Sequence, residues 1–292
     1  MRGLYWVRTD LRMHDNHALD SFCRECDAGI LLWCPTQSYS KAALYRKDFI
    51  DDCLKHFASE VSKFKQVLIV GGDSIDRELP FYLLEHRIEK VYYTKECAYD
   101  EVCDEKIIEN LCFQNHVRCE SFDQATLVSR TKLPFEVENM PFVFTDFRKK
   151  VEAHLKVIEP IDGPKNLPQK ILDHPPPLNN SLQKELLFSG GENAAIARIQ
   201  NYFFQTSNID SYKETRNGMI QWNDSAKLSP WFALGCLSPR YVFSELKKYE
   251  SEVKANESTY WLLFELLWRD YLKFFSVKYQ KQIFQESGVR KR

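Results

Sequence analysis

One face of the helix predicted at residues 258–275 carries groups that could do chemistry. The sequence there is apolar on nearly all sides, which is typical of a buried helix. Helical spacing places five residues on one stripe of that helix: Trp261, Glu265, Trp268, Arg269 and Leu272. Buried charge is costly unless it is paired or meets a ligand. The stripe is therefore either an intrahelical salt bridge between Glu265 and Arg269 or a polar floor for a bound planar molecule.

A second polar group precedes a predicted helix start. Ser229-Pro230 and Ser238-Pro239 each place a hydroxyl at an N-cap and a proline at the first helical position. The stretch before the first of these starts holds two hydroxyls and one ammonium group: Ser225, Ala226, Lys227, Leu228 and Ser229. Free amides and the helix dipole would make this stretch a seat for a diphosphate. The alternative is a Ser-Pro cap with no ligand.

Short β-rich runs alternate with amphipathic helical stretches over residues 1–120. Strands are predicted at residues 4–7, 29–34, 67–70, 91–94 and 117–121. This alternation predicts an α/β doubly wound domain whose parallel sheet is covered on both faces. No G-x-G-x-x-G follows the first strand, so no dinucleotide is predicted at that strand.

A change of composition divides the chain. Half of the twelve prolines lie between residues 160 and 177, including Pro175, Pro176 and Pro177. Because proline lacks an amide donor and favours extended neighbours, this stretch predicts a long linker. Beyond Gly191 the pattern is helical throughout. We therefore predict three parts, which are an α/β domain at 1–130, an interdomain linker at 131–187 and an all-α domain at 188–292.

The overall composition limits which partners the protein could bind and in which compartment it could lie. Lys and Arg total 40 against 41 Asp and Glu, so a nucleic acid would be bound by a local patch rather than by net charge. No apolar run approaches the length of a membrane span and no signal peptide opens the chain, which predicts a soluble, cytoplasmic protein with no membrane partner. Cys23 and Cys26 form a C-x-x-C without a second pair, so we expect reduced structural cysteines and no metal site.

Three motifs share their order and spacing with a known family. Residues 212–217 (YKETRN), 227–240 (KLSPWFALGCLSPR) and 265–270 (ELLWRD) closely resemble the photolyase and cryptochrome family. Residues 144–152 (FTDFRKKVE) and 190–192 (GGE) look like its DASH cryptochrome branch. The resemblance covers almost the whole chain. It implies a photolyase-type α/β antenna domain followed by the first half of a helical FAD-binding domain.

The resemblance assigns roles to residues of both candidate groups. The diphosphate and sugar side of the flavin would be held by five residues: Tyr212, Ser225, Lys227, Leu228 and Ser229. Glu265 would hydrogen-bond a pyrimidine dimer and stabilise the charge it gains from excited reduced flavin, and Trp268 would stack on it. Arg269 would contact flavin or a DNA phosphate. Ala226 replaces a hydroxyl residue usual in the family, which removes one phosphate donor.

Two further charged groups follow predicted strands. By resemblance, the cleft between the domains commonly holds a light-harvesting chromophore, often a reduced folate such as methenyltetrahydrofolate, and its glutamate corresponds to Glu96. Lys95 stands where related photolyases often have an amide; the alternative is that both side chains lie in a solvated loop. Arg8, Asp10 and Arg12 could bind an anion, but we favour a lock of ion pairs.

The resemblance predicts an FAD-dependent, blue-light DNA photolyase of the cryptochrome DASH type, a carbon–carbon lyase that splits cyclobutane pyrimidine dimers. A dimer buried in a duplex cannot reach the cofactor, so enzymes of this type flip it out or act on single strands, and single-stranded DNA is the expected substrate. Members of the family continue through a further helical region, so the sequence is a fragment, a truncated product or a natural half-length relative. The alternatives are a flavin-binding photoreceptor without repair activity and a remnant that binds no flavin. The sequence leaves the oligomeric state open.

Overall fold

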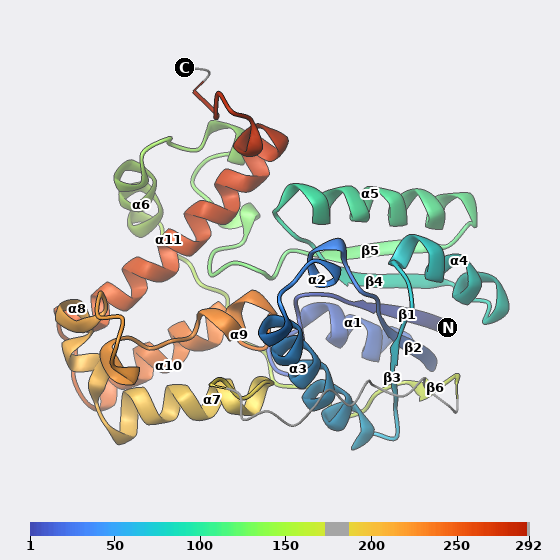
Figure 1. Ribbon diagram of the computed structural model, residues 1–292, viewed down its shortest axis with the longest axis horizontal. Coiled ribbons are helices and arrows are strands. Elements are labelled where there is room, and N and C mark those ends of the chain that lie inside the picture. The colour runs from blue at the N-terminus through green and yellow to red at the C-terminus, as the bar shows by residue number, and fades with distance from the viewer. Residues whose placement is uncertain (173–186, 291–292) are drawn as a thin grey trace.

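The computed structural model describes residues 1–172 and 187–290. An α/β part built from the N-terminal residues lies beside a helical part built from the C-terminal residues (Figure 1). Pro175, Pro176 and Pro177 of the predicted linker lie outside the described residues. No helix within the described ranges combines the length and the apolar character that a membrane span requires.

Five parallel strands form the sheet of the α/β part. They are β1 (Arg2–Val7), β2 (Ala28–Trp33), β3 (Leu68–Val70), β4 (Lys90–Thr94) and β5 (Arg118–Phe122), in the order β3-β2-β1-β4-β5. The predicted doubly wound sheet is confirmed, and the predicted strand ends lie within two residues of the observed ones. A short strand, β6 (Gln169–Lys170), pairs with β2 inside the stretch predicted as linker.

Helices cover both faces of this sheet (Figure 1). They are α1 (His17–Glu25), α2 (Gln37–Ser40), α3 (Leu44–Ser62), α4 (Ile75–Glu85) and α5 (Tyr99–Gln114). Tyr5 and Val7 of β1 belong to the core that contains α1 and α3 side chains, whereas Leu4 and Trp6 belong to the core that contains α4 and α5 side chains. Because successive residues of a strand point to opposite faces, this alternation fixes one helix pair on each side.

The helical part is organised along one long helix. Its helices are α7 (Glu192–Gln200), α8 (Tyr212–Thr215), α9 (Ser229–Ala233), α10 (Pro239–Glu252) and α11 (Glu257–Tyr279), with a wider turn at Asn201–Gln205. Single 3-10 turns occur at Arg130–Lys132, Val137–Asn139, Asn208–Ser211, Trp222–Asp224 and Gln280–Phe284. Asn256 caps the N-terminus of α11, because its side chain accepts the backbone N–H of Thr259 at 2.9 Å.

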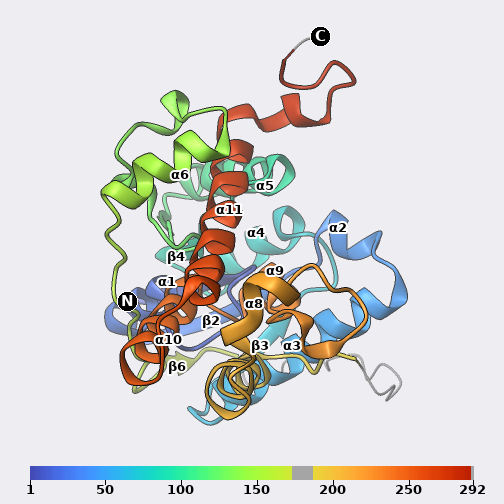
Figure 2. The same ribbon diagram turned by 90° about the vertical axis from the view of Figure 1, so that its left-hand side faces the viewer.

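The stretch predicted as linker also contributes to the core. It forms α6 (Phe144–Ala153), which lies beside α11 (Figure 2). Phe144, Phe147 and Val151 of α6 are buried. Phe147 packs against Tyr271 of α11 with ring centroids 5.3 Å apart. This contact holds the middle of α11 in place.

One of the two predicted helix starts is wrong by a residue. Ser238 caps α10 as predicted, and its hydroxyl accepts the backbone N–H of Arg240 at 3.1 Å. The helix α9, however, begins at Ser229 with Leu228 in the cap position, and no side chain caps it. Lys227, just before this cap position, has a left-handed φ of 56°, and Leu228 already has helical backbone angles.

Contacts around residues 8–15 join the two parts. Arg12 donates to the carbonyl oxygen of Gly235 at 3.0 Å. Arg240 forms a buried salt bridge of 2.8 Å with Asp15, which also accepts the hydroxyl of Ser238. Buried charges paired in this way cannot separate without leaving one of them unpaired. The junction therefore fixes the start of α10 against the carboxyl end of β1.

The cluster after β1 is held by internal contacts. Arg8 forms a salt bridge with Glu105 and donates to the carbonyl oxygen of Thr94 at 3.1 Å. The buried carboxylate of Asp10 accepts hydrogen bonds from the hydroxyls of Tyr5 and Thr94. Since the described contacts already satisfy these groups, they support the predicted lock rather than an anion site.

Candidate functional site

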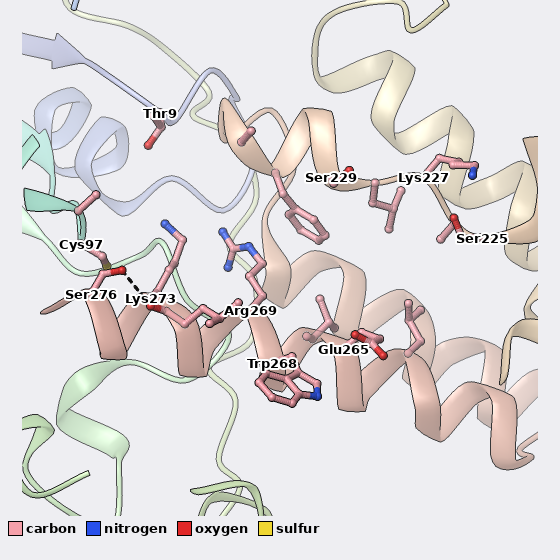
Figure 3. A pocket seen from close by; sticks show the side chains of 18 of the residues that line it. Thr9, Cys97, Ser225, Lys227, Ser229, Glu265, Trp268, Arg269, Lys273 and Ser276 are labelled. Atoms are coloured by element: carbon pink, nitrogen blue, oxygen red, sulfur yellow. Dashed lines mark hydrogen bonds between the residues drawn. The ribbon is translucent and has the colours of Figure 1, made fainter. Parts of the chain in front are cut away.

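A cavity of about 890 Å³ lies between α11 and the segment that leads into α9 (Figure 3). The nine residues singled out from the sequence all line it: Glu96, Tyr212, Ser225, Lys227, Leu228, Ser229, Glu265, Trp268 and Arg269. Thr9 and residues 96–98 of the α/β part complete one wall. The cavity therefore spans the junction between the two parts of the molecule. The roles of these residues remain predictions.

Glu265 and Arg269 do not pair with each other, so the intrahelical salt bridge is the wrong alternative. Glu265 accepts a hydrogen bond of 2.7 Å from Arg216, whose guanidinium also lies 4.5 Å from the ring centre of Trp261. Arg269 instead donates to the carbonyl oxygen of Ala125 at 2.8 Å. Arg269 also lies 3.6 Å from the carboxylate of the adjacent Asp270, so Glu265 and Arg269 are two separate polar groups on the cavity wall.

Asp270 anchors α11 on its opposite side. Its two carboxylate oxygens accept the backbone N–H groups of Leu127 and Val128 at 3.0 and 2.9 Å. Burial raises the pKa of Asp270 to about 6, although Arg269 and the two amides favour the charged form. The anchor fixes the rotation of α11 and so aims Glu265 and Arg269 at the cavity.

Trp268 has one ring face already covered. Its indole stacks on Phe144 with centroids 3.7 Å apart and an interplanar angle of 18°. The residue is half-buried and lines the cavity, so a stacking partner would have to use what remains exposed. Further along the same stripe, Leu272 is 56% exposed. The helix predicted to be buried is therefore exposed at this position, because the stripe faces an open cavity.

The segment from Ser225 to Ser229 forms the wall opposite α11. Figure 3 shows Ser225, Lys227 and Ser229 along this segment. The five residues of α9 give a short helix, so the helix dipole contributes less at this wall than a long helix would. The hydroxyls and the ammonium group are thus the main polar groups available to an anion here.

Glu96 is buried rather than solvated, which contradicts the loop alternative. Its side chain is 7% exposed, and burial raises its pKa. One carboxylate oxygen has no hydrogen-bond partner, and the other lies 3.8 Å from the ammonium group of Lys273. A second cavity, of about 410 Å³, shares with the first the residues Thr9, Glu96, Glu101 and Ala233. An unpaired buried oxygen between two cavities is suited to a ligand donor.

Four further side chains that line or support the cavity were not among the predicted site residues. Lys273 could have been found, because it lies on the same helical stripe two turns after Glu265. Arg216 belongs to a quoted motif, but its partner is 49 residues away. Phe232 lies 5.0 Å from the guanidinium of Arg269. In the sequence, Arg198 is a lone charge in an apolar run, and its contacts with residues 222–226 are not visible there.

The residues around the cavity fit a flavin nucleotide. The volume of the cavity lies within the range of about 300–1,000 Å³ that is usual for small-molecule sites. Hydroxyls and a lysine gather on one wall, and Leu262, Leu266 and Phe232 supply apolar surface for a planar ring. The described residues contain no group of three or more His, Cys, Asp or Glu side chains that could hold a metal ion.

An α/β part that faces a helical part across such a cavity is the architecture of photolyases and cryptochromes. A cryptochrome from Synechocystis sp. PCC6803 matches with a TM-score of 0.90 at 31% identity, over 99% of this chain and 64% of its own. A class III photolyase from Agrobacterium tumefaciens matches with a TM-score of 0.84 over 98% of this chain and 63% of its own. At 18% identity, that likeness shows the fold alone.

Residues 3–168 match the family model described as DNA photolyase, and the chain belongs to this family. The cryptochrome DASH of Danio rerio is 38% identical over 307 residues, which cover 97% of this chain and 59% of that protein. The predicted resemblance to the photolyase and cryptochrome family, with its DASH branch, is confirmed. The chain spans 59–62% of the length of three such relatives.

Proposed function

We propose that this chain binds FAD in the cavity at the junction of its two parts and serves blue-light-driven splitting of cyclobutane pyrimidine dimers in single-stranded DNA. One observation carries the proposal. Nine residues named by family resemblance, drawn from four separate stretches of the chain, line one cavity of about 890 Å³. Membership of the DNA photolyase family supports flavin as the ligand.

The cavity walls divide the binding of the cofactor between them. Ser225, Lys227 and Ser229 would hold the diphosphate through two hydroxyls and one ammonium group. Tyr212, which is 8% exposed, would pack against the sugar side. Bound reduced flavin supplies the light-driven electron that opens the dimer. The protein's own residues would bind the cofactor, orient it and exclude water from it.

Glu265 and Trp268 would receive the flipped bases. The Glu265 carboxylate would accept an N–H of a pyrimidine while Arg216 holds its other side at 2.7 Å. Stacking on an aromatic ring is worth about 1–3 kcal/mol per base, which offsets part of the unstacking cost. Trp268 would provide this stacking with the part of its ring that Phe144 leaves uncovered.

Glu96 would contact a second, light-harvesting chromophore such as a reduced folate. Its unpaired oxygen lies where the two cavities adjoin, so a ligand N–H could reach it. Replacing Glu96 with glutamine should weaken the binding of added methenyltetrahydrofolate, measured by equilibrium dialysis, and leave the flavin content unchanged. Equal retention of the folate by wild type and variant would remove this role from Glu96.

An absorption spectrum of the purified chain tests the proposed cofactor. The protein should carry the bands of bound flavin, and extraction should release FAD. Replacing Ser225 and Ser229 together with alanine should lower the flavin content, whereas replacing the remote Ser62 should not. A colourless wild-type protein that takes up no added FAD would leave only the interpretation of a remnant.

Dimer splitting under blue light tests the proposed activity. Glu265→Gln should slow the splitting of a dimer in a single-stranded oligonucleotide while the flavin content stays unchanged. Glu152→Gln is a matched control, because Glu152 also pairs with an arginine, Arg148, outside the cavity. A wild-type chain that binds FAD and splits no dimer would favour a photoreceptor without repair activity.

A further inference from the structure

Arg198 of α7 is a buried arginine whose donors converge on one short loop. Arg198 is 6% exposed. Its guanidinium donates to four oxygens: Trp222 O at 3.3 Å, Asn223 Oδ1 at 2.9 Å, Ser225 O at 3.0 Å and Ala226 O at 3.0 Å. The guanidinium also lies 4.8 Å from the ring centre of Tyr202. One side chain therefore holds residues 222–226 as a unit.

The charge of Arg198 has no acidic counterpart. Among the described residues, no carboxylate lies within salt-bridge distance of its guanidinium, whereas the equally buried Arg240 is paired with Asp15 at 2.8 Å. Burial lowers the pKa of Arg198, which is the expected direction for a cation removed from water. Its positive charge is balanced by oxygen dipoles of the loop and by the rings of Tyr202 and Trp222, whose centres lie 4.8 and 5.2 Å from the guanidinium.

The position of this charge matters because the loop is also a cavity wall. Ser225 and Ala226 line the cavity, and Arg198 does not. Since their carbonyl oxygens are bound by Arg198, those oxygens are directed to the far side of the wall. Carbonyl oxygens in the cavity would repel an anion. Arg198 thus turns two repulsive dipoles away from the cavity and places a positive charge without an acidic partner behind the segment.

We propose that Arg198 is a positioning residue for the phosphate end of the bound flavin nucleotide. It acts through the backbone of Ser225 and Ala226 and touches no ligand itself. The inference rests on the proposed binding of FAD in this cavity. It adds that discrimination for a phosphorylated flavin depends on a side chain outside the cavity, which lies 27 and 28 residues before Ser225 and Ala226 in the chain.

Titration of flavin-free protein with FAD and with riboflavin, which has no phosphate, tests this role. Arg198→Met should raise the Kd for FAD about ten- to a hundredfold, because hydrogen bonds to a charged group are lost, and change the Kd for riboflavin little. Arg198→Lys, a milder change, should raise the Kd for FAD several-fold, because one ammonium group cannot span four acceptors. Arg240→Met is the matched control for the loss of a buried arginine.

The ratio of the two Kd values separates positioning from general stability. Arg240→Met should lower the melting temperature and leave the ratio of FAD to riboflavin affinity as in wild type. Equal losses for FAD and riboflavin in Arg198→Met, or wild-type FAD affinity in a folded Arg198→Lys, would overturn the role of Arg198 alone. A wild-type chain that binds neither ligand would overturn the proposed function and this inference with it.

Discussion

The charged residues on the cavity side of α11 each find a partner on a different segment of the chain. Glu265 pairs with Arg216, Arg269 with the carbonyl oxygen of Ala125, and Lys273 lies 3.8 Å from Glu96. Partially buried charges need such partners, because removal from water is costly. The consequence is that α11 is fixed to the α8 turn and to the α/β part by the same residues that face the cavity.

The pair between Arg216 and Glu265 should matter for activity more than for cofactor binding. We expect Arg216→Met to slow dimer splitting about tenfold, because a carboxylate that loses a charged hydrogen bond is no longer held in one orientation. Flavin content should stay at the wild-type level, as measured by absorption. Arg148→Met, which breaks a comparable pair with Glu152 away from the cavity, is the control. Unchanged splitting in Arg216→Met would show that Glu265 needs no such support.

The anchor at Asp270 should give the fold a measurable dependence on pH. Burial raises the pKa of Asp270 to about 6, above the value of 3.8 for an exposed aspartate. The folded protein therefore holds this proton more tightly than the unfolded chain does. The stabilisation it provides is complete below the unfolded pKa and is lost as the pH rises through the folded pKa.

Urea unfolding of wild type and Asp270→Asn at several pH values measures this effect. From about pH 4 to about pH 7, the free energy of unfolding of wild type should fall relative to that of the variant by roughly 1–3 kcal/mol. The substitution also changes the free energy of unfolding by an amount that does not depend on pH. This amount cancels, because the test compares how steeply the free energy of unfolding changes with pH in the two proteins. Parallel pH profiles for the two proteins would contradict the raised pKa.

At the scale of residues, the sequence predicts which side chains share a surface but not what they touch. Helical spacing placed Glu265, Trp268 and Arg269 on one stripe, and all three line the cavity. Their partners come from segments as far as 144 residues away, which no local period encodes. For that reason the predicted alternative of a salt bridge between Glu265 and Arg269 was wrong, although Arg269 does lie 3.6 Å from the adjacent Asp270.

At the scale of elements, the turn between α9 and α10 depends on one glycine. Gly235 has a φ of +63°, and a Cβ there would overlap the carbonyl oxygen of Thr9. The close approach lets Arg12 reach the carbonyl oxygen of Gly235 at 3.0 Å. This turn therefore requires glycine for its conformation and for its contact with the α/β part.

Gly235→Ala should consequently destabilise the protein by about 3 kcal/mol or more, the sum of backbone strain and overpacking. Gly72→Ala should change the free energy of unfolding by less than about 0.5 kcal/mol, because the nearest atom to its added Cβ is 3.8 Å away. Chemical denaturation of both variants provides the measurement. Equal stability of the two would mean that the turn relaxes around the new methyl group.

The bounds of helices and strands were predicted well where the local sequence pattern was clear. The strands β1 to β5 were predicted to within two residues, because buried apolar runs between amphipathic helices leave little choice. The start of α9 and the strand β6 were missed. Leu228 takes the cap position after the left-handed Lys227, a backbone conformation that the Ser-Pro pattern does not indicate. The strand β6 exists because Gln169 and Lys170 pair with Ala28 and Gly29 at the start of β2, which is a tertiary contact that no local pattern encodes.

At the scale of the whole molecule, the cavity exists because the two parts are held together. Thr9, Glu96 and Glu101 of the α/β part face residues of α9 and α11 across it. The buried pair of Asp15 with Arg240, together with the hydroxyl of Ser238, lies in the junction beside the cavity. We therefore expect the two parts to open as one cooperative unit rather than independently.

Amide hydrogen exchange of wild type and Asp15→Ala tests this coupling without any ligand. In wild type, the strands β1 and β4 and the helices α10 and α11 should open with the same free energy. In Asp15→Ala, Arg240 is left as an unpaired buried charge, which costs about 3–5 kcal/mol, so α10 and α11 should exchange well before β1 and β4. Asp20→Ala, which breaks only the exposed pair with Arg24, should leave all four elements together. Protection that stays equal in Asp15→Ala would place the coupling between the two parts elsewhere in the junction, and Arg12 with Gly235 would be the next contact to break.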